Sequence, residues 1–504
     1  MPINLNAQFE NLQRICRIAA RAVQAAPARV RRVITTFELN DLGAFCAAKG
    51  LQLAVRMMRS HEFLVLLAAT LAALGGGLTA SASWQAGVAR VDITPTESIW
   101  LAGYGSRTHS SEGVRQHIFA KALALKDDQG VVTVLVTSDL LGFPREASEP
   151  IAARAEKQFS LPRERLVLNS SHTHSAPVID HMLRAAYPFG DAEMAVIQRY
   201  TAWLEDQVVD LIGRSMHDLA PAQLSFEQGL AGFAVNRRRV RHRDYPELVD
   251  QDVPVIAVRS ADGSLRAIVF GYACHNTVLN DYQINGDYAG YAQVELEKGH
   301  PGAIAMFVQG CGADANPLPR HSVDLAESYG KILAAATDEV LREKMRPLNG
   351  PLGAAFVLVD IPFQRPPSRQ EFQSHLSDKD TISRQHAEIM LQILDRDGKL
   401  PDHYPYPIEV WQFGKDLTFI ALGGEVVVDY SLRFKRQYGF DNVWVAGYSN
   451  DVFAYIPSLR VLREGGYEGG DAMPLYGQPA RFGAAIEEII AEKVDEVVKH
   501  LCAQ

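Results

Sequence analysis

The chain of 504 residues contains little cysteine: there are five in all, and no two of them form a Cys-x-x-Cys pair. Cys16 and Cys46 precede the apolar segment described below, which leaves Cys274, Cys311 and Cys502. An odd number argues against a disulfide framework, and the lack of a Cys-x-x-Cys pair argues against a zinc site built from cysteines. Pairing of Cys274 with Cys311 in an oxidising compartment stays open.

The sequence also lacks an excess of positive charge. Its 50 Lys and Arg are outnumbered by 59 Asp and Glu, which gives a formal net charge of −9 and a pI near 5.9. Nucleic-acid-binding proteins usually carry a basic face, so we expect no nucleic-acid partner.

No repeat of fixed period is visible, which argues against a solenoid. The hydrophobic fraction of 47% is enough for a large core.

No apolar run reaches the roughly 20 residues that a membrane-spanning helix needs. The best candidate, 63–78, is shorter and contains three consecutive glycines. Met-Met-Arg-Ser (57–60) precedes it and Thr-Ala-Ser-Ala (79–82) follows it, an order typical of an export signal with an Ala-x-Ala cleavage site. We therefore predict a signal peptide over 57–82, cut after Ala82, and export to the periplasm or the medium. The alternative is an uncleaved signal anchor.

This signal begins at residue 57 rather than at residue 1. We therefore expect 1–56 to be an extension upstream of a true start at Met57 or Met58. The mature part, 83–504, shows no strong break in composition and is expected to form one domain. Within it, 363–408 is rich in proline and charge and is the best candidate for an insertion or a mobile cap.

Strand-like and helix-like segments alternate along the mature chain, which predicts an α/β fold with a layered mixed sheet covered by helices. Apolar or alternating runs predict strands at 84–95, 120–130, 131–142, 165–170, 253–259, 265–273, 303–310 and, as a pair, within 408–428. Helical spacing predicts helices at 146–158, 192–218, 289–298, 322–344 and 480–501.

Four of the predicted strands end abruptly in small and polar residues. Ligands of α/β sheets bind beyond the carboxyl ends of strands, so we expect these segments to converge in space. Glycine and alanine there allow the backbone to approach a ligand closely. The four segments are 169–177, 272–277, 308–317 and 421–426.

His172 and His174 lie two residues apart in the first segment. On an extended backbone such side chains point the same way, so both imidazoles can face one centre. Imidazole suits zinc, which takes three protein ligands and an open position in catalytic sites. The alternative is a pair of hydrogen-bonded loop histidines. His275 and Glu425, at two other strand ends, favour the metal site; the alternatives are a core histidine and an exposed loop carboxylate.

Other polar residues near the strand ends are ambiguous. Asp139, Asp314 and Asn316 are interpreted as supporting or loop-capping groups rather than as metal ligands. The run Asn-Arg-Arg-Arg (236–239) is either a solvated basic loop or the source of one guanidinium that holds a carboxylate or an oxyanion.

The motif Asn-Ser-Ser-His-Thr-His-Ser-Ala-Pro (169–177) resembles the Thr-His-Thr-His-Ser-Gly-Pro motif of the neutral, non-lysosomal ceramidases. A late block, 455–470, resembles the family's two tyrosines twelve positions apart before Glu-Gly-Gly. The motifs between them follow the family's order over about 88–480. These are Gly103-Tyr104, the Ala-Lys-Ala-Leu strand, the Asn-Arg segment, Ile-Asn-Gly-Asp-Tyr-Ala-Gly-Tyr-Ala (284–292), Val-Gln-Gly-Cys-Gly-Ala-Asp-Ala-Asn-Pro (308–317) and Glu425.

The resemblance implies a zinc amidohydrolase that converts N-acylsphingosine to a fatty acid and a sphingoid base. Zinc lowers the pKa of bound water toward about 7 and polarises the amide carbonyl, and each donor to the oxyanion contributes on the order of 3 kcal/mol. In this sequence the implied metal ligands are His174, Glu425, Tyr455 and His117. The residues assigned to catalysis are Tyr467, as oxyanion donor, with Arg237, His172, His275 and Asp287.

Three features depart from the family pattern. Arg115 fills the place of a family histidine ligand, and His117 follows two residues later. Gly286 fills the place of a serine with a catalytic role in the family, so we expect a metal-bound water as the attacking group. The C-terminal β-sandwich of many members is not expected, because the sequence ends one helix after the late block. These departures bear more on ceramide as substrate than on zinc-dependent hydrolysis.

Three functions therefore stay open. The first is an exported, ceramidase-like zinc hydrolase of an N-acyl amide. The second is a zinc hydrolase of a different amide or ester, and the third is an inactive homologue that binds lipid or glycan. The partner expected is a small lipid or acyl-amide substrate, with a transient contact to a membrane surface and no protein partner.

Overall fold

The computed structural model describes residues 84–503, which belong to one unit, Ala82–Gln504. The predicted extension 1–56 and signal peptide 57–82 lie outside the described residues. Among the residues that are described, no helix combines the length and the apolar character needed to cross a bilayer.

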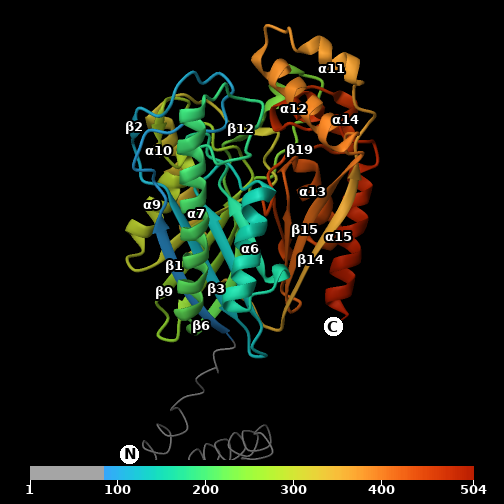
Figure 1. Cartoon of the computed structure of the whole chain (residues 1–504). Coiled ribbons are helices and arrows are strands. Elements are labelled where there is room, and N and C mark those ends of the chain that lie inside the picture. Colours follow the sequence, from blue (N-terminus) through green and yellow to red (C-terminus); the bar gives the residue numbers. More distant parts are fainter. Residues whose placement is uncertain (1–83, 504) are drawn as a thin grey trace, which may run out of the picture. The chain divides into compact units, whose positions relative to one another are not determined.

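Within residues 84–503, nine strands form the larger of two main sheets, here called sheet A (Figure 1). Its two ends are parallel and its centre is antiparallel. The order is β11 (Ile304–Gln309), β9 (Leu265–Tyr272), β8 (Asp252–Ser260), β6 (Ala220–Leu230), β1 (Trp84–Asp92), β3 (Phe119–Lys126), β4 (Val132–Ser138) and β5 (Leu166–Ser170), with β13 (Arg346–Pro347) beside β6.

The smaller sheet, sheet B, contains β14 (Leu352–Pro362), β15 (His403–Phe413), β16 (Leu417–Leu422) and β18 (Val443–Ala446), in that order. β14 and β15 pair along their whole length, so the chain between them leaves and re-enters the sheet at one end. This excursion forms α11 (Arg369–His375) and α12 (Thr381–Asp397), at the top of Figure 1. It covers most of the proline- and charge-rich segment.

Sheets A and B pack face to face through one apolar layer. Side chains of alternate residues leave a strand on opposite faces, and one set from each sheet meets in this layer. Phe226 and Val269 of sheet A are buried there together with Trp411, Phe419 and Trp444 of sheet B.

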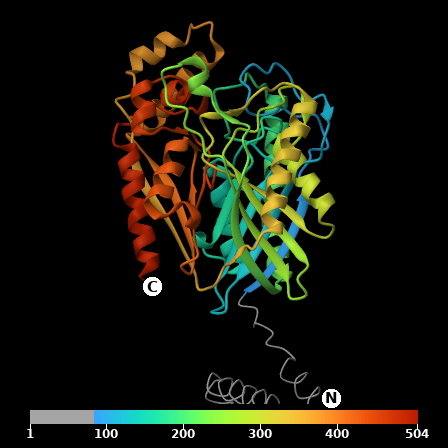
Figure 2. The ribbon, with the colours of Figure 1, turned by 180° about the vertical axis from the view of Figure 1, so that it is seen from behind.

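Helices cover the other face of each sheet. On sheet A, α7 (Asp191–His217) packs against β1 and β3 with α6 (Arg145–Phe159) beside it, while α10 (Val323–Arg342) and α9 (Asp287–Gly299) pack against the β6, β8 and β11 side (Figure 2). On sheet B, α15 (Ile486–Cys502) packs against β14 and β15, and α13 (Val428–Tyr438) against β18. The described residues thus form helix, sheet, sheet and helix layers, and the predicted α/β fold with a layered mixed sheet is confirmed.

The strands and helices expected from the sequence are present, with ends displaced by a few residues. The elements missed include the strands β6, β14 and β18 and the helices α11, α12 and α13. β6 begins with Ala-Pro and contains Gly229, residue types that are rare in strands. β14 is an edge strand whose side chains are partly exposed on both faces, so its alternation is weak.

Cys274 and Cys311 are both buried and free, so the disulfide left open above is not formed.

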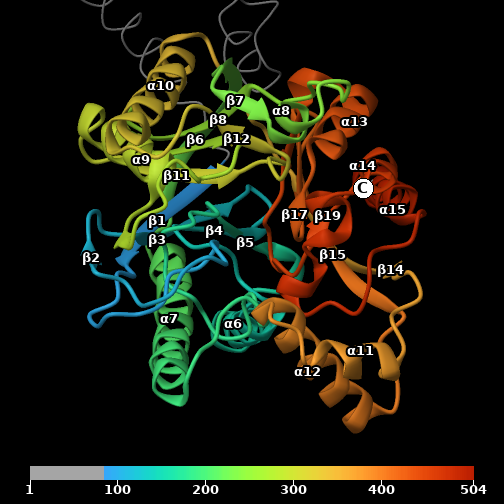
Figure 3. The same cartoon turned by 90° about the horizontal axis from the view of Figure 1, so that it is seen from above.

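Short pairs of strands, parallel or antiparallel, lie at the end of the main sheets where the predicted polar segments also lie (Figure 3). Within the described residues these are β2 (Gly113–Val114) with β10 (Gln283–Ile284), β7 (Ala234–Asn236) with β12 (Ala315–Pro317), and β17 (Glu425–Val426) with β19 (Tyr455–Ile456).

Asn169, in β5, joins the two main sheets. Its side-chain Nδ2 donates to the Gly447 carbonyl oxygen at 2.8 Å and to Ser449 Oγ at 3.1 Å, and its Oδ1 accepts from the Gln309 backbone N–H at 2.9 Å. The residue is fully buried, so no water can replace these bonds easily.

We predict that Asn169→Ala lowers the free energy of unfolding by about 3 kcal/mol, because it leaves buried backbone groups of both sheets without partners. Urea denaturation measures this. The control is Gln437→Ala, which removes an exposed amide that donates to Asp495 at 2.8 Å and should change the free energy by less than about 0.5 kcal/mol. Equal effects of the two variants would contradict the role given to Asn169.

Candidate active site

The loops that follow β5 and β9 lie side by side. Thr173 and Asn276 form a bridge between them, and the Asn276 side chain donates to the Ser171 carbonyl oxygen at 2.6 Å. The backbone N–H of His174 donates to the Asn276 carbonyl oxygen at 3.2 Å. This pairing brings the histidines of the two loops together.

Three imidazoles and one carboxylate meet at a single point. His172 Nε2 lies 3.1 Å from His174 Nε2, and Glu425 Oε2 lies 3.2 Å from His172 Nε2 and 3.1 Å from His275 Nε2. All four side chains are buried. Glu425 begins β17 and pairs with Tyr455 of β19, whose hydroxyl lies 3.5 Å from His275 Nε2.

The backbone at His172 is not extended, as the sequence analysis assumed, but left-handed, with φ of 62°. Such a φ is uncommon outside glycine. The turn is held by the His172 backbone N–H, which donates to the Leu140 carbonyl oxygen at 2.9 Å. The imidazoles of His172 and His174 still face one centre, but a turn in the loop aims them there rather than strand alternation.

Backbone carbonyls fix the tautomer of two of the histidines. His172 Nδ1 lies 2.7 Å from the Leu141 carbonyl oxygen, and His275 Nδ1 lies 2.9 Å from that of Gly312. A carbonyl only accepts, so we assign the proton of each neutral ring to Nδ1, which leaves a lone pair on Nε2. Both Nε2 atoms lie beside Glu425 Oε2, at 3.2 Å and 3.1 Å, an arrangement that a cation would stabilise.

The protonation equilibria favour the same conclusion. Burial lowers the pKa of His275 to about 4, helped by the charge of Arg237. Burial and the neighbouring histidines hold the pKa of His174 well below its usual range. Burial acts to raise the pKa of Glu425, but His172 and His275 more than offset this and hold that pKa well below its usual range. With Nε2 unprotonated, imidazoles beside a carboxylate form a donor set that fits a divalent metal ion.

Gly103 lets the His174 ring reach this position. A Cβ on Gly103 would lie 2.3 Å from His174 Cγ, and its φ of 98° also favours glycine. The Tyr104 ring packs edge-on against the same imidazole, with centroids 4.8 Å apart. The Gly-Tyr pair seen in the sequence therefore shapes the site. His174 Nδ1 is buried and has no hydrogen-bond partner among the described residues.

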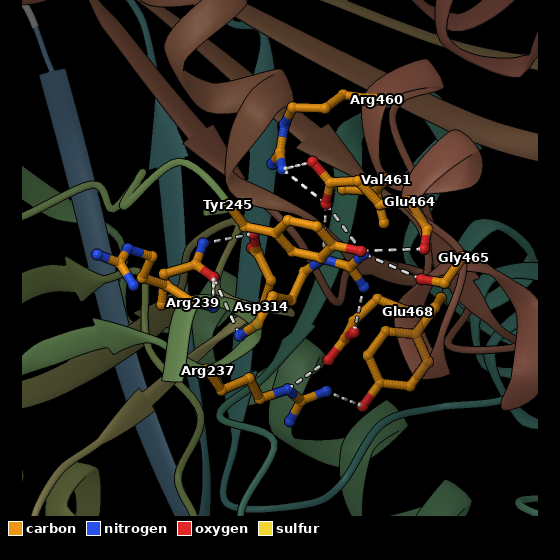
Figure 4. A network of polar contacts seen from close by, with 12 residues as sticks. Arg237, Arg239, Tyr245, Asp314, Arg460, Val461, Glu464, Gly465 and Glu468 are labelled. Carbon is orange, nitrogen blue, oxygen red and sulfur yellow. Dashed lines mark hydrogen bonds and ion pairs between the residues drawn. The ribbon is translucent and has the colours of Figure 1, made fainter. Parts of the chain in front are cut away.

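Arg237 faces the same centre from α8 (Arg237–Arg241). Its guanidinium donates to the Tyr455 hydroxyl at 3.0 Å and to Glu468 Oε1 at 2.6 Å (Figure 4). The Asn236 side chain caps α8 and donates to Asp314 Oδ2 at 2.9 Å, which anchors the helix. Burial acts against the charge of Arg237, but Tyr455 and Glu468 raise its pKa well above the usual value. The Asn-Arg run is thus not a solvated loop at this position.

Tyr467 and Tyr476 complete the phenols around the site. The Tyr467 ring packs edge-on against Tyr455, with centroids 5.2 Å apart, and it is 41% exposed. Tyr476 is buried and donates a short hydrogen bond to Glu425 Oε1. Sequence reasoning missed Tyr476, because it lies outside every motif and only the fold brings it to Glu425.

The structure does not bring His117 to the other histidines. Its Nδ1 lies 2.6 Å from Asp92 Oδ2, and its side chain is 66% exposed. Arg115, in the place of the family's histidine, pairs with Asp281 at 2.6 Å. A fourth protein donor would have to come from Glu425 or Tyr455 instead, both of which already adjoin the imidazoles.

Asp287 supports a loop rather than lining the site. This buried residue accepts hydrogen bonds from the backbone N–H groups of Val278 at 3.2 Å, Leu279 at 2.9 Å and Tyr288 at 2.7 Å. The preceding Gly286 is tightly packed, because a Cβ there would lie 2.8 Å from Gly290 Cα. The packing at this position therefore suits glycine and leaves no room for the side chain of the serine that the family has there.

The site opens into a cavity with two arms, both lined by Gly103, His174, Tyr455 and Tyr467. The polar arm, of about 690 Å³, extends over Arg237, Arg238 and Arg320. The apolar arm, of about 120 Å³, is lined further by Leu141, Leu183, Ala186, Ile382, Leu475 and Tyr476. Ile382 belongs to α12, so the excursion from sheet B closes the apolar arm.

Residues 84–317 match the family model described as "Neutral/alkaline non-lysosomal ceramidase, N-terminal". The curated neutral ceramidase of Drosophila pseudoobscura pseudoobscura is 25% identical over 237 residues, which are 44% of this chain and 33% of that protein. That of Mycobacterium tuberculosis is 24% identical over 246 residues, which are 43% and 37% of the two chains. The chain thus spans about a third of the length of these relatives.

Two solved structures share the fold. The neutral ceramidase of Pseudomonas aeruginosa has a TM-score of 0.64 and 20% identity, covering 84% of this chain and 74% of that one. A structure titled "Ceramidase complexed with C2" has a TM-score of 0.64 and 18% identity, covering 84% and 76%. The resemblance drawn from the motifs is confirmed. The structural match is the broader one, since the family match ends at residue 317, before Glu425 and the tyrosines.

We predict that His275→Ala loses the bound metal ion, because it removes one of the Nε2 lone pairs that converge on Glu425. Metal analysis of purified protein should show about one ion per wild-type chain and less than about a tenth of that in the variant. The matched control is His117→Ala, which should keep its metal. Loss of metal in His117→Ala alone would contradict this assignment.

Asp287 makes a separate prediction about pH. Burial raises its pKa to about 6, against about 3.8 for the free group, and the backbone N–H bonds oppose this only in part. The folded protein therefore holds this proton more tightly than the unfolded chain, and the associated stability is present below about pH 4 and lost as the pH rises through 6. Relative to Asp287→Asn, which cannot titrate, the wild type should lose about 3 kcal/mol of unfolding free energy between pH 4 and pH 7. A difference measured by urea denaturation that does not vary with pH would refute this.

Proposed function

Since the chain matches the neutral ceramidases over residues 84–317, we propose that it is a zinc-dependent hydrolase of an N-acyl amide bond, with N-acylsphingosine as the first substrate to test. The observation that carries the proposal is the meeting of three histidines and Glu425 at one wall of a cavity that also exposes Arg237 and Tyr467. Metal-binding and oxyanion-binding groups are thereby within reach of one amide.

Zinc is the ion proposed, because imidazole and carboxylate donors in a site with an open side are typical of catalytic zinc. His172, His174, His275 and Glu425 would hold it, with Tyr455 adjacent. When bound, zinc supplies a lowered pKa for a coordinated water and polarises a carbonyl group. The carbonyls that accept from His172 Nδ1 and His275 Nδ1 orient both rings for this role.

The remaining polar groups act on the developing negative charge. Partial burial, with Glu425 as a further cause, raises the pKa of Tyr467 to about 12, so its hydroxyl keeps its proton at neutral pH and can donate to an oxyanion. Arg237 keeps its charge and holds the Tyr455 hydroxyl, which orients that phenol toward the histidines. With glycine at 286, water is the attacking group in this proposal rather than a side chain.

A second candidate is a hydrolase of a different amide. It is favoured by the apolar arm, whose 120 Å³ is less than the 150 Å³ or so of an engineered cavity that binds benzene. An arm of this size suits a short acyl group better than a long one, unless α12 moves aside. The inactive lipid- or glycan-binding homologue is less well supported, because a binding protein has no need of a metal donor set and oxyanion donors together.

Export belongs to the same proposal. The signal-like sequence at 57–82 supports a mature protein that begins near Ser83 and acts in the periplasm or the medium, where it would meet lipid substrates at a membrane surface. Residues 83–504 would then be its catalytic domain.

The test is release of fatty acid from ceramide by the zinc-loaded protein, with a chelated sample beside it. We expect release that stops with chelator and returns with zinc. Tyr467→Phe should lower kcat by about 100-fold, because it removes one oxyanion donor. Tyr438→Phe is the control: its hydroxyl contacts Asp495 of α15 and does not line the cavity, so activity should be kept.

The other outcomes separate the alternatives. Bound zinc without release from ceramide would favour the hydrolase of a different amide or ester. Neither zinc nor release would reject both hydrolases and leave the binding protein.

A further inference from the structure

The two arms of the cavity differ in chemistry as well as in size. The apolar arm ends in aliphatic side chains of Leu183, Ile382 and Leu475, and no charged residue lines it beyond the metal donors. The polar arm is several times larger and is lined by guanidinium groups. An amide placed at the shared wall would therefore put its acyl group in the apolar arm and its amine-side group in the polar arm.

Two of the arginines in the polar arm are already paired with carboxylates. Arg237 pairs with Glu468 at 2.6 Å, and Arg238 pairs with Glu468 at 2.6 Å and with Glu464 at 3.0 Å. Arg460 also pairs with Glu464, at 2.8 Å. Figure 4 shows this network, which forms one wall of the arm and whose charges are largely paired with one another.

Arg320 is different. It lines the polar arm and is partly buried, but it has no hydrogen bond or ion pair to any of the residues that the structure describes. Its positive charge reaches two other groups, Tyr104 and Asp287. Burial raises the pKa of each, and the charge of Arg320 acts to lower it. The residues that line the arm include two carboxylates, Glu464 and Glu468, and both are already paired.

We propose that the polar arm binds a negatively charged head group on the amine side of the acyl amide, and that Arg320 is the residue that recognises it. The head group is a carboxylate or a phosphate, which a guanidinium binds with charge-assisted hydrogen bonds. The proposal rests on the second candidate given above, the hydrolase of a different amide, and makes the preferred substrate a short acyl amide of an acidic amine.

The test uses two matched pairs of substrates with the zinc-loaded full chain. N-butanoylglycine is compared with N-butanoylglycinamide, and N-butanoylethanolamine phosphate with N-butanoylethanolamine, so that the two pairs distinguish carboxylate from phosphate. The measured quantity is the ratio of kcat/KM within each pair. We expect the wild type to prefer the anion of at least one pair by about 10- to 100-fold, mainly through KM.

Substitutions then assign the preference. Arg320→Gln should bring that ratio close to one, and Arg320→Glu should reverse it in favour of the neutral member. Arg342→Gln removes an exposed arginine near the end of α10 and should keep the wild-type ratio. A wild-type ratio of one in both pairs, or a preference that survives Arg320→Glu in a folded protein, would overturn the proposal.

Binding separates this proposal from the proposed hydrolysis. If the wild type cleaves none of the four amides, calorimetry gives the ratio of Kd values within each pair. Tighter binding of an anion that is lost in Arg320→Gln supports the head-group site while counting against the hydrolase. Equal Kd values within both pairs overturn the head-group site.

Discussion

The buried carboxylate of Glu425 is the group on which the arrangement of the site depends. A carboxylate without partners is very costly in a protein interior, and this one is surrounded by His172, His275 and the Tyr476 hydroxyl. Two of these neighbours are locked by backbone carbonyls with their Nε2 atoms facing inward. The geometry that surrounds the carboxylate with these two rings therefore also brings their Nε2 atoms to one point, which is the condition for holding a metal ion.

That arrangement depends on the contact between the two main sheets. His172 and His174 follow sheet A, whereas Glu425 follows sheet B, and Asn169 with its partners sets how the two sheet ends meet. Around this contact several residues that are not glycine adopt positive φ angles: His172, Tyr448 and Asn450. Backbone of this kind persists only where the surroundings hold it, and buried hydrogen bonds such as that from the Leu168 backbone N–H to Asn450 Oδ1, at 3.0 Å, do so here.

The two arms of the cavity are shaped by different helices that lie above the site. α12, part of the excursion between β14 and β15, brings Ile382 over the apolar side, and α8 brings guanidinium groups to the polar side. The ionic network of Arg237, Arg238, Glu464 and Glu468 fixes the second wall, so the shape of the polar arm is largely set before a ligand binds.

The sequence by itself determined the α/β class, most strands and helices, and the four polar segments at strand ends, because apolar periodicity and strand-end chemistry are local properties. It also indicated His172, His174, His275 and Glu425, although its reason for the first pair was incomplete: the turn at His172 could not be read from alternation. Only the tertiary structure decided that His117 pairs with Asp92 instead of approaching the histidines, and that Asp287 binds backbone N–H groups. It alone brought Tyr476 to Glu425 and left Arg320 without a partner among the described residues, because such contacts join segments far apart in the chain and depend on how whole layers pack.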